Sequence, residues 1–138
     1  MGVIHTLGQN YVRDLVFQGA IQGDLYLGLM EEGAVRPVSA TLNSGVTEVT
    51  GTGYSRILIA NNADWLDTID GRAEHVEKTF NVGSGGWNNV RGWFLINAAS
   101  GAGAVLFSEI FPAVEQGNQL EGVAIKIKTA IRFKDVTQ

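Results

Sequence analysis

The sequence predicts a mainly β protein, an antiparallel β-sandwich or jelly roll with one short N-terminal helix. Three observations lead to this prediction. After residue 22, apolar and polar side chains alternate with the period of a β-strand. Glycine occupies 18 of the 138 positions, against a usual share of about 7%, so the chain turns often. No helices alternate with the expected strands, which argues against a parallel α/β sheet.

The only expected helix spans residues 6–22. Leu7, Tyr11 and Leu15 recur at every fourth position and form an apolar stripe along one side of it. A helix this short is stable only when its stripe docks on protein, either on its own chain or on a neighbour. The polar segment 31–52 then follows the first strand, and it is too long for a simple turn. We expect it to be functional or partly disordered.

The expected strands share short lengths and glycine-rich boundaries, and they span residues 25–29, 54–60, 75–82, 90–99, 104–111 and 125–133. The strand 25–29 is expected to be half-buried, with its leucines facing inward. The strand 90–99 is almost entirely apolar, which favours burial on both faces. In the strand 125–133, isoleucines alternate with basic residues, so one face points inward and the other is basic.

Length and composition limit the possible functions. A chain of 138 residues has the size of one domain, and we expect residues 1–138 to form a single β-sandwich domain. Charged residues make up 17%, below the roughly 25% usual for soluble proteins, which suggests that neighbouring molecules cover part of the surface. The absence of cysteine excludes disulfides and thiolate chemistry. A net charge of -4 argues against nonspecific binding to nucleic acid.

The sequence predicts neither a catalytic set nor a cofactor or metal site. The G-x-S-x-G elbow of serine hydrolases and a complete dinucleotide-binding glycine motif are both missing. Asp64, Asp67 and Asp70 recur at every third residue, which is not the ligand spacing of an EF-hand, so we interpret them as solvated loop carboxylates. His5 precedes the helix, and His75 lies on the polar face of a strand, which is typical of a solvated or interface histidine.

The sequence also predicts no contact with a membrane. No apolar run approaches the ~18 to 20 residues of a membrane span. The N-terminus lacks the basic and apolar regions of a signal peptide. We therefore expect the protein to be made in a cytoplasm and kept there until assembly.

Two features of the sequence indicate contact with other proteins. Lys126, Lys128 and Arg132 form a basic face on the last strand, where they either protect a sheet edge or dock on an acidic partner. Trp87 lies in a glycine- and asparagine-rich turn. Its indole either packs over an open end of the sandwich or serves as an exposed anchor for a partner or a glycan.

The order of these segments resembles small virion proteins of tailed bacteriophages, in particular jelly-roll capsid cement (decoration) proteins. The resemblance rests on the N-terminal helix followed by Leu25-Tyr26-Leu27-Gly28-Leu29, Gly53-Tyr54-Ser55-Arg56, Gly86-Trp87, Gly92-Trp93-Phe94, Ala98-Ala99-Ser100-Gly101, Leu106-Phe107 and Gly117-Asn118. It covers nearly the whole chain, although each motif by itself is generic.

The resemblance implies a homodimer or homotrimer, made in the host cytoplasm, that binds the outside of the major capsid shell and stabilises the head. It implies interface roles only, for Trp87 and for Lys126, Lys128 and Arg132 against acidic capsid surface. Part of segment 31–52 is expected to order on assembly.

Two other functions remain open. A tail- or fibre-associated receptor-binding module would stack Trp87 or Trp65 on sugars. A glycan hydrolase would need two carboxylates brought together in a cleft. Its candidates are Glu109, Glu115, Asp64 and Asp67.

Overall fold

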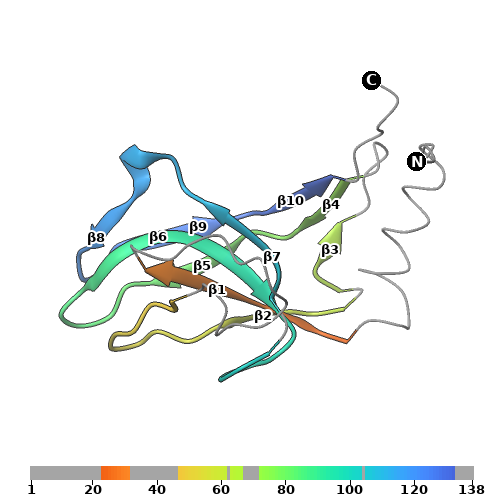
Figure 1. Cartoon of the computed structure of the whole chain (residues 1–138), viewed down its shortest axis with the longest axis horizontal. Coiled ribbons are helices and arrows are strands. Elements are labelled where there is room, and N and C mark those ends of the chain that lie inside the picture. Colours follow the sequence, from red (N-terminus) through yellow and green to blue (C-terminus); the bar gives the residue numbers. More distant parts are fainter. Residues whose placement is uncertain (1–22, 32–46, 62, 67–71, 104, 133–138) are drawn as a thin grey trace. The chain divides into compact units, whose positions relative to one another are not determined.

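The computed structural model describes residues 23–31, 47–61, 63–66, 72–103 and 105–132 (Figure 1). The expected helix at 6–22 and residues 32–46 of the long polar segment lie outside the described residues. Strands make up 52% of the described residues and pair in antiparallel sheets, which confirms the mainly β prediction. No helix among the described residues is long and apolar enough to cross a membrane.

The chain divides into two compact units. The larger unit combines residues 25–58 with 79–126, and the smaller combines 1–24, 59–78 and 127–138, each considered within its described residues. The chain therefore passes between the units more than once.

A five-stranded sheet forms the centre of the larger unit, with strand order β2-β1-β6-β7 and with β8 also paired to β6. Its strands are β1 (Leu25–Glu31), β2 (Ile57–Ile59), β6 (Trp87–Ile96), β7 (Val105–Ile110) and β8 (Gly117–Gln119). The long β6 is central because it pairs with β1 on one side and with both β7 and β8 on the other. A 3-10 turn, η2 (Ala113–Glu115), links β7 to β8.

Both faces of this sheet are apolar where β1 meets β6. On one face, Met30, Phe94, Ile96 and Val105 form a buried cluster against which Tyr26 and Ile110 pack. The opposite face carries the leucines of β1 together with Trp93 and Leu95, which are also buried. The expected burial of the apolar strand on both faces is confirmed. The first strand, however, is not half-buried, because Gly28 and Met30 are buried as well as its leucines.

Gly28 shows why the alternating pattern was incomplete. It lies directly opposite Phe94 in the register of β1 and β6. A Cβ atom at this position would stand 2.4 Å from Cζ of the Phe94 ring, so only glycine leaves room for that ring. The alternating pattern places Gly28 on the face opposite the leucines, and this glycine is buried because it leaves room for the Phe94 ring.

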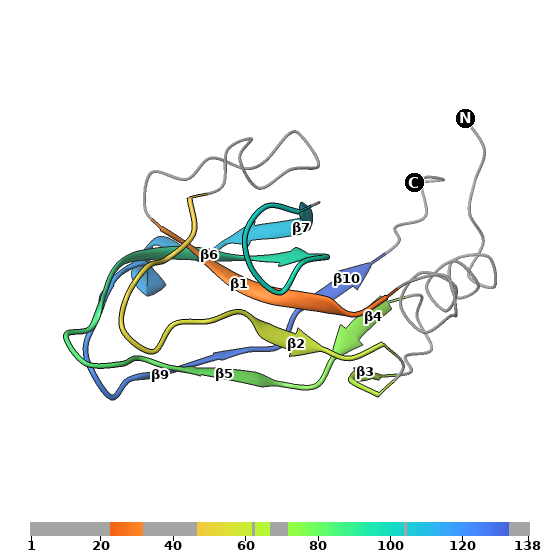
Figure 2. The same cartoon turned by 90° about the horizontal axis from the view of Figure 1, so that it is seen from below.

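The smaller unit contains a three-stranded antiparallel sheet in the order β10-β4-β3. These strands are β3 (Trp65–Leu66), β4 (Arg72–His75) and β10 (Ala130–Arg132). A separate pair, β5 (Lys78–Asn81) and β9 (Ala124–Ile127), runs side by side in Figure 2.

All the expected strands differ in extent from the prediction: β1 runs on to Glu31, β6 runs from Trp87 to Ile96 and β7 from Val105 to Ile110, while the other three are interrupted or shortened. The strand expected at 75–82 is interrupted at Val76–Glu77, between β4 and β5, and the strand expected at 125–133 is interrupted at Lys128–Thr129. The strand expected at 54–60 begins only at Ile57. At both interruptions the chain changes the strand with which it pairs. A pattern of alternating side chains does not reveal such a change of partner.

Candidate functional site

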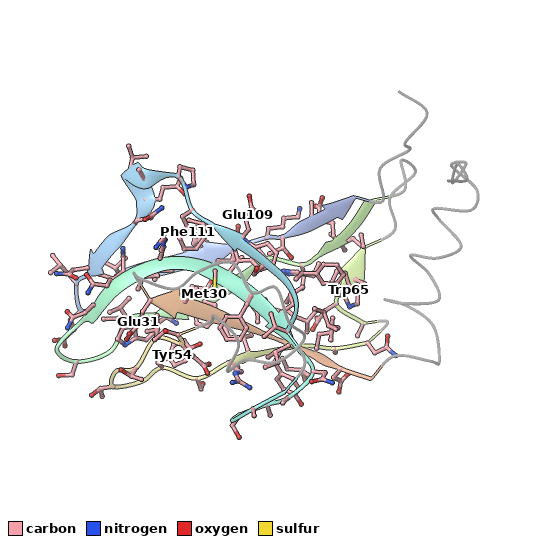
Figure 3. The ribbon with its side chains drawn as sticks, in the orientation of Figure 1. Met30, Glu31, Tyr54, Trp65, Glu109 and Phe111 are labelled. Carbon is pink, nitrogen blue, oxygen red and sulfur yellow. The ribbon has the colours of Figure 1, made fainter. Side chains whose placement is uncertain are left out.

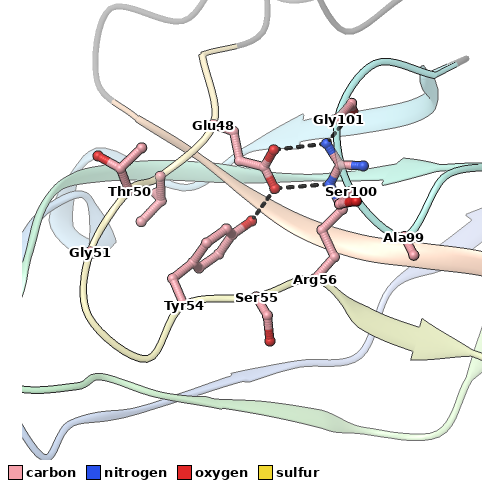
Figure 4. Close-up of a pocket in the computed structure, with 10 residues that line it drawn as sticks. Glu48, Thr50, Gly51, Tyr54, Ser55, Arg56, Ala99, Ser100 and Gly101 are labelled. Atoms are coloured by element: carbon pink, nitrogen blue, oxygen red, sulfur yellow. Dashed lines mark hydrogen bonds and ion pairs between the residues drawn. The ribbon is translucent and has the colours of Figure 1, made fainter.

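A polar network joins the buried Arg56 to the half-buried Tyr54 and Glu48 in the larger unit (Figure 4). Nε of Arg56 donates to Oε1 of Glu48 at 2.9 Å, and Nη2 donates to Oε2 at 2.8 Å, so the two side chains form a bidentate ion pair. The Tyr54 hydroxyl donates to Oε1 of the same carboxylate at 2.8 Å. Only 2% of the Arg56 side chain is exposed, so this pair is held largely away from water.

Arg56 also fastens the loop that follows β6. Its Nη1 donates to the carbonyl of Ala98 and its Nη2 to the carbonyl of Gly101, both at 2.7 Å. The guanidinium carbon lies 5.7 Å from the centre of the Phe94 ring, within the range of a cation–π contact. One arginine thus ties residues 98–101 and Glu48 to the core of the sheet.

Tyr54 provides a hydrogen bond that the sheet itself does not. The backbone N–H of Leu29 on β1 donates to the Tyr54 hydroxyl at 2.9 Å, while the carbonyl of Leu29 accepts from the N–H of Val49. Burial raises the pKa of Tyr54 well above its ordinary value, and the nearby Glu48 charge raises it further. The hydroxyl therefore stays protonated, as its hydrogen bond to the carboxylate requires.

A hollow of about 430 Å³ opens beside this network. It is lined by Glu48, Val49, Thr50, Gly51, Tyr54, Ser55, Arg56, Ala99, Ser100 and Gly101. The ionisable groups at its wall are bonded to each other and to backbone carbonyls. Because Arg56 already donates four hydrogen bonds, its charge serves to hold the loops and not to bind an anion.

The sequence pattern does not indicate this network. In the sequence, Tyr54 and Arg56 belong to one face of the expected strand 54–60, and Glu48 belongs to the long polar segment 31–52. Their spacing of two residues placed both side chains on one side of an extended segment, which was the available signal. The carboxylate partner was not visible in the pattern, because its position depends on how segment 47–50 returns along β1.

His75 in the smaller unit forms a second polar site. Its side chain is fully buried, with 0% exposure, so the interpretation as a solvated histidine was wrong. The Thr129 N–H donates to Nε2 at 3.2 Å, and Nδ1 lies 2.6 Å from the Val76 carbonyl. These partners fit a neutral ring with its proton on Nδ1. Burial lowers the pKa of His75, and this effect outweighs the opposing influence of the Val76 carbonyl.

Trp65 and Asp64 complete the surroundings of His75. The Trp65 indole meets the imidazole edge to face at 5.7 Å between ring centres. Asp64 accepts the N–H of Ala60 at 2.7 Å and pairs with Lys78 at 2.9 Å. Burial alone would raise the pKa of Asp64, but these two donors outweigh burial and lower it. Asp64 is thus a bonded structural residue, whereas Asp67 and Asp70 lie outside the described residues.

The four expected interface residues differ in their surroundings. Trp87 is only 1% exposed, and its Nε1 donates to the Thr52 carbonyl at 3.0 Å. Its indole therefore has the packed position that was one of the two alternatives, without the exposed face that an anchor needs. Lys128 is solvent-accessible but pairs with Glu74 at 2.8 Å. Lys126 is exposed, and Arg132 lies on β10 with its side chain outside the described part.

An exposed apolar feature lies close to Lys126 in the sequence. We call residues 111–123, which run from the end of β7 through η2 and β8, the arm. The arm carries Val114 and Leu120, which at 92% and 74% are the most exposed of the large apolar side chains described. Beside it is a hollow of about 270 Å³ lined by Val90, Phe111, Glu115, Gln119, Val123, Ala124, Ile125 and Lys126.

The carboxylates considered for glycan hydrolysis have separate surroundings. Glu109 is exposed on β7 and points away from the sheet in Figure 3, while Glu115 is exposed on η2. Asp64 is engaged with Lys78, and Asp67 lies outside the described residues. Among the residues that the structure describes, no group of three or more His, Cys, Asp or Glu side chains is placed to hold a metal ion.

Comparison with known proteins identified no relatives: no protein-family model matches the chain, and neither does any curated protein or solved structure.

Proposed function

We propose that this chain is a structural protein of a bacteriophage particle, a cement protein that binds the outside of the major capsid shell and stabilises the head. In this proposal the antiparallel sheets belong to one β-sandwich of the jelly-roll type. The protein is made in the host cytoplasm and works as a homo-oligomer, through protein contacts alone.

The observation that carries the proposal is the exposed apolar arm. Isolated apolar side chains are normal on a protein surface, but a segment that exposes several of them beside a hollow favours a contact with another protein. Val114, Leu120 and Val123 lie within ten residues of one another and are all exposed. This surface supports a binding function for the chain.

The polar network supports the same proposal. Tyr54, Glu48 and Arg56 are engaged with each other and with the backbone, so their polar groups strengthen the architecture. Rigid loops favour assembly because less freedom is lost when a partner binds. The resemblance to jelly-roll cement proteins then selects the capsid shell as the partner.

We assign the three expected basic residues to two different surfaces. Lys126 lines the hollow beside the arm, so we leave it to that surface. Lys128 and Arg132 are the cations proposed to meet acidic capsid surface, where charge sets orientation and rate of encounter. The pair between Lys128 and Glu74 leaves the amine partly exposed, with 47% of the Lys128 side chain accessible.

Co-sedimentation with major capsid shells that lack the protein tests the proposal. We expect saturable binding in a fixed ratio, and we expect Lys128→Gln to bind less than Ser84→Asp. Both variants change the net charge by the same amount, but Ser84 lies in the exposed turn before β6. A protein that ignores the shells and binds isolated tails or glycans would instead support the tail-associated alternative.

A further inference from the structure

The arm is fixed to the rest of the larger unit by hydrogen bonds on both sides. The Phe111 N–H donates to the Arg91 carbonyl at 2.9 Å, and the Asn89 N–H donates to Oδ1 of Asn118 at 2.9 Å. At the far end, Val82 exchanges two backbone hydrogen bonds with Gly122 and Val123, both at 2.9 Å. The exposed side chains are therefore held in place before any partner arrives.

The arm presents a projection and a hollow side by side. Leu120 and Val114 project into solvent, while the apolar residues that line the hollow are Val90, Phe111, Val123, Ala124 and Ile125. A cavity of ~150 Å³ is large enough to hold benzene, so a hollow of about 270 Å³ admits an aliphatic side chain. Figure 1 shows the arm as the segment that leads from β7 through β8 to β9.

The charges around this hollow are also complementary to each other. Glu115 and Lys126 both line it, so the same surface carries one acidic and one basic group beside an apolar centre. In the described part of the chain, neither of these two side chains has an ion-pair partner. A two-fold axis places residue i against j and residue j against i, which would bring each Glu115 to the Lys126 of the other copy.

We propose that the arm is a self-association surface, on which a second copy of this chain docks about a two-fold axis. In this contact the projecting Leu120 or Val114 of each copy enters the hollow of the other, and Glu115 pairs with Lys126 across the interface. Within one chain neither Leu120 nor Val114 lines the hollow, so the hollow of each copy is open to a side chain of the other. Self-association is part of the proposed function, but this assignment rests on the geometry of the arm.

Light scattering over a range of concentrations tests the contact directly. We expect the wild-type protein to have about twice the monomer mass of 14.8 kDa. Leu120→Asp should raise the dissociation constant roughly 30-fold, the effect of losing a central apolar contact at an interface. Leu58→Asp is the control, since Leu58 on β2 is also an exposed leucine, at 42% against 74% for Leu120, and does not belong to the arm.

A charge exchange tests the two-fold geometry. Glu115→Lys should weaken the dimer by placing two cations together, and adding Lys126→Glu should restore it. Circular dichroism checks that each variant is folded. If Leu120→Asp does not fold, Val114→Asp takes its place. A monomeric or trimeric wild type, or an Asp variant as dimeric as the Leu58 control, overturns the proposal.

The outcome is separable from that of the proposed function. Shell binding is measured on its own, with both the dimeric protein and a dissociated arm variant. Dimers that ignore capsid shells contradict the cement proposal alone. Shell-binding monomers contradict the self-association surface and the homo-oligomer of the proposed function, but they leave shell binding itself in place.

Discussion

Replacing Tyr54 by phenylalanine removes one oxygen atom from the centre of the polar network. The hydroxyl accepts the N–H of Leu29 at 2.9 Å and donates to Glu48 at 2.8 Å. Leu29 has 0% exposure, so its N–H depends on the Tyr54 hydroxyl and not on solvent for a partner in the folded protein. The ring contacts remain available to phenylalanine, with ring centres 6.0 Å from Phe80 and 5.5 Å from Trp87.

The expected loss follows from the unpaired backbone group. A buried donor left without a partner costs about 1–3 kcal/mol, and Glu48 keeps its bonds to Arg56. We therefore expect Tyr54→Phe to lower the free energy of unfolding by about 1–3 kcal/mol in a urea titration. Tyr26→Phe is the matched control, because the Tyr26 hydroxyl has no hydrogen-bond partner among the described residues, and we expect it to stay within about 0.5 kcal/mol of wild type.

The pH dependence provides a second readout. The folded-state pKa of Tyr54 is raised above the ordinary 10.0, so folding favours the protonated hydroxyl. This contribution to stability is complete below pH 10.0 and is lost as the pH rises above it. Tyr54→Phe should weaken the alkaline loss of stability. If Tyr54→Phe and Tyr26→Phe have the same stability and the same alkaline slope, the role assigned to the hydroxyl is wrong.

Three further predictions concern the other buried sites. Arg56→Leu should destabilise the fold by about 3 kcal/mol or more, because it leaves the Glu48 carboxylate without its main partner. A double-mutant cycle with Glu48→Gln, measured by urea unfolding, should show strong coupling between the two substitutions. Additive effects would contradict the ion pair. For His75, folding favours the neutral ring, so its contribution to stability is complete above pH 6.5. Below pH 6.5 the free energy of unfolding falls by up to about 1.4 kcal/mol per pH unit. His75→Gln should reduce this slope, and an unchanged slope would assign the acid sensitivity to other groups. Gly28→Ala should lower the free energy of unfolding by about 1–3 kcal/mol, because the added methyl group clashes with the Phe94 ring. Adding Phe94→Leu should recover part of that loss in thermal melts. If the two substitutions destabilise the protein independently, the clash is excluded.

The alternation of side chains was sufficient to locate most strands but not their partners. In the segment 127–130, Ile127 and Thr129 are buried while Lys128 and Ala130 are exposed, so the alternation continues without a break. Yet the chain leaves β9 and enters β10 within these residues, changing its partner from β5 to β4. Alternation reports which face of an extended chain is buried, and it contains no information about the strand beside it.

The buried polar residues were the least predictable part of the candidate site. Nothing in the sequence next to His75 shows that Thr129, 54 positions later, donates to its ring. Trp87 posed the same problem, because its burial depends on Gly51, whose missing Cβ leaves room for the indole, and on the Thr52 carbonyl. These contacts arise from long-range packing, so a local pattern could only leave the alternatives open.

The network and the arm should respond to mutation in opposite ways. Tyr54, Glu48 and Arg56 make their contacts within one chain, so their variants should change the free energy of unfolding far more than association. Leu120 and Val114 make few contacts within the chain, since most of each side chain is exposed, so their variants should change association with little effect on folding. A network variant that dissociates the protein while leaving its stability unchanged would show that the network itself contacts a partner, and the division between support and contact surface would have to be redrawn.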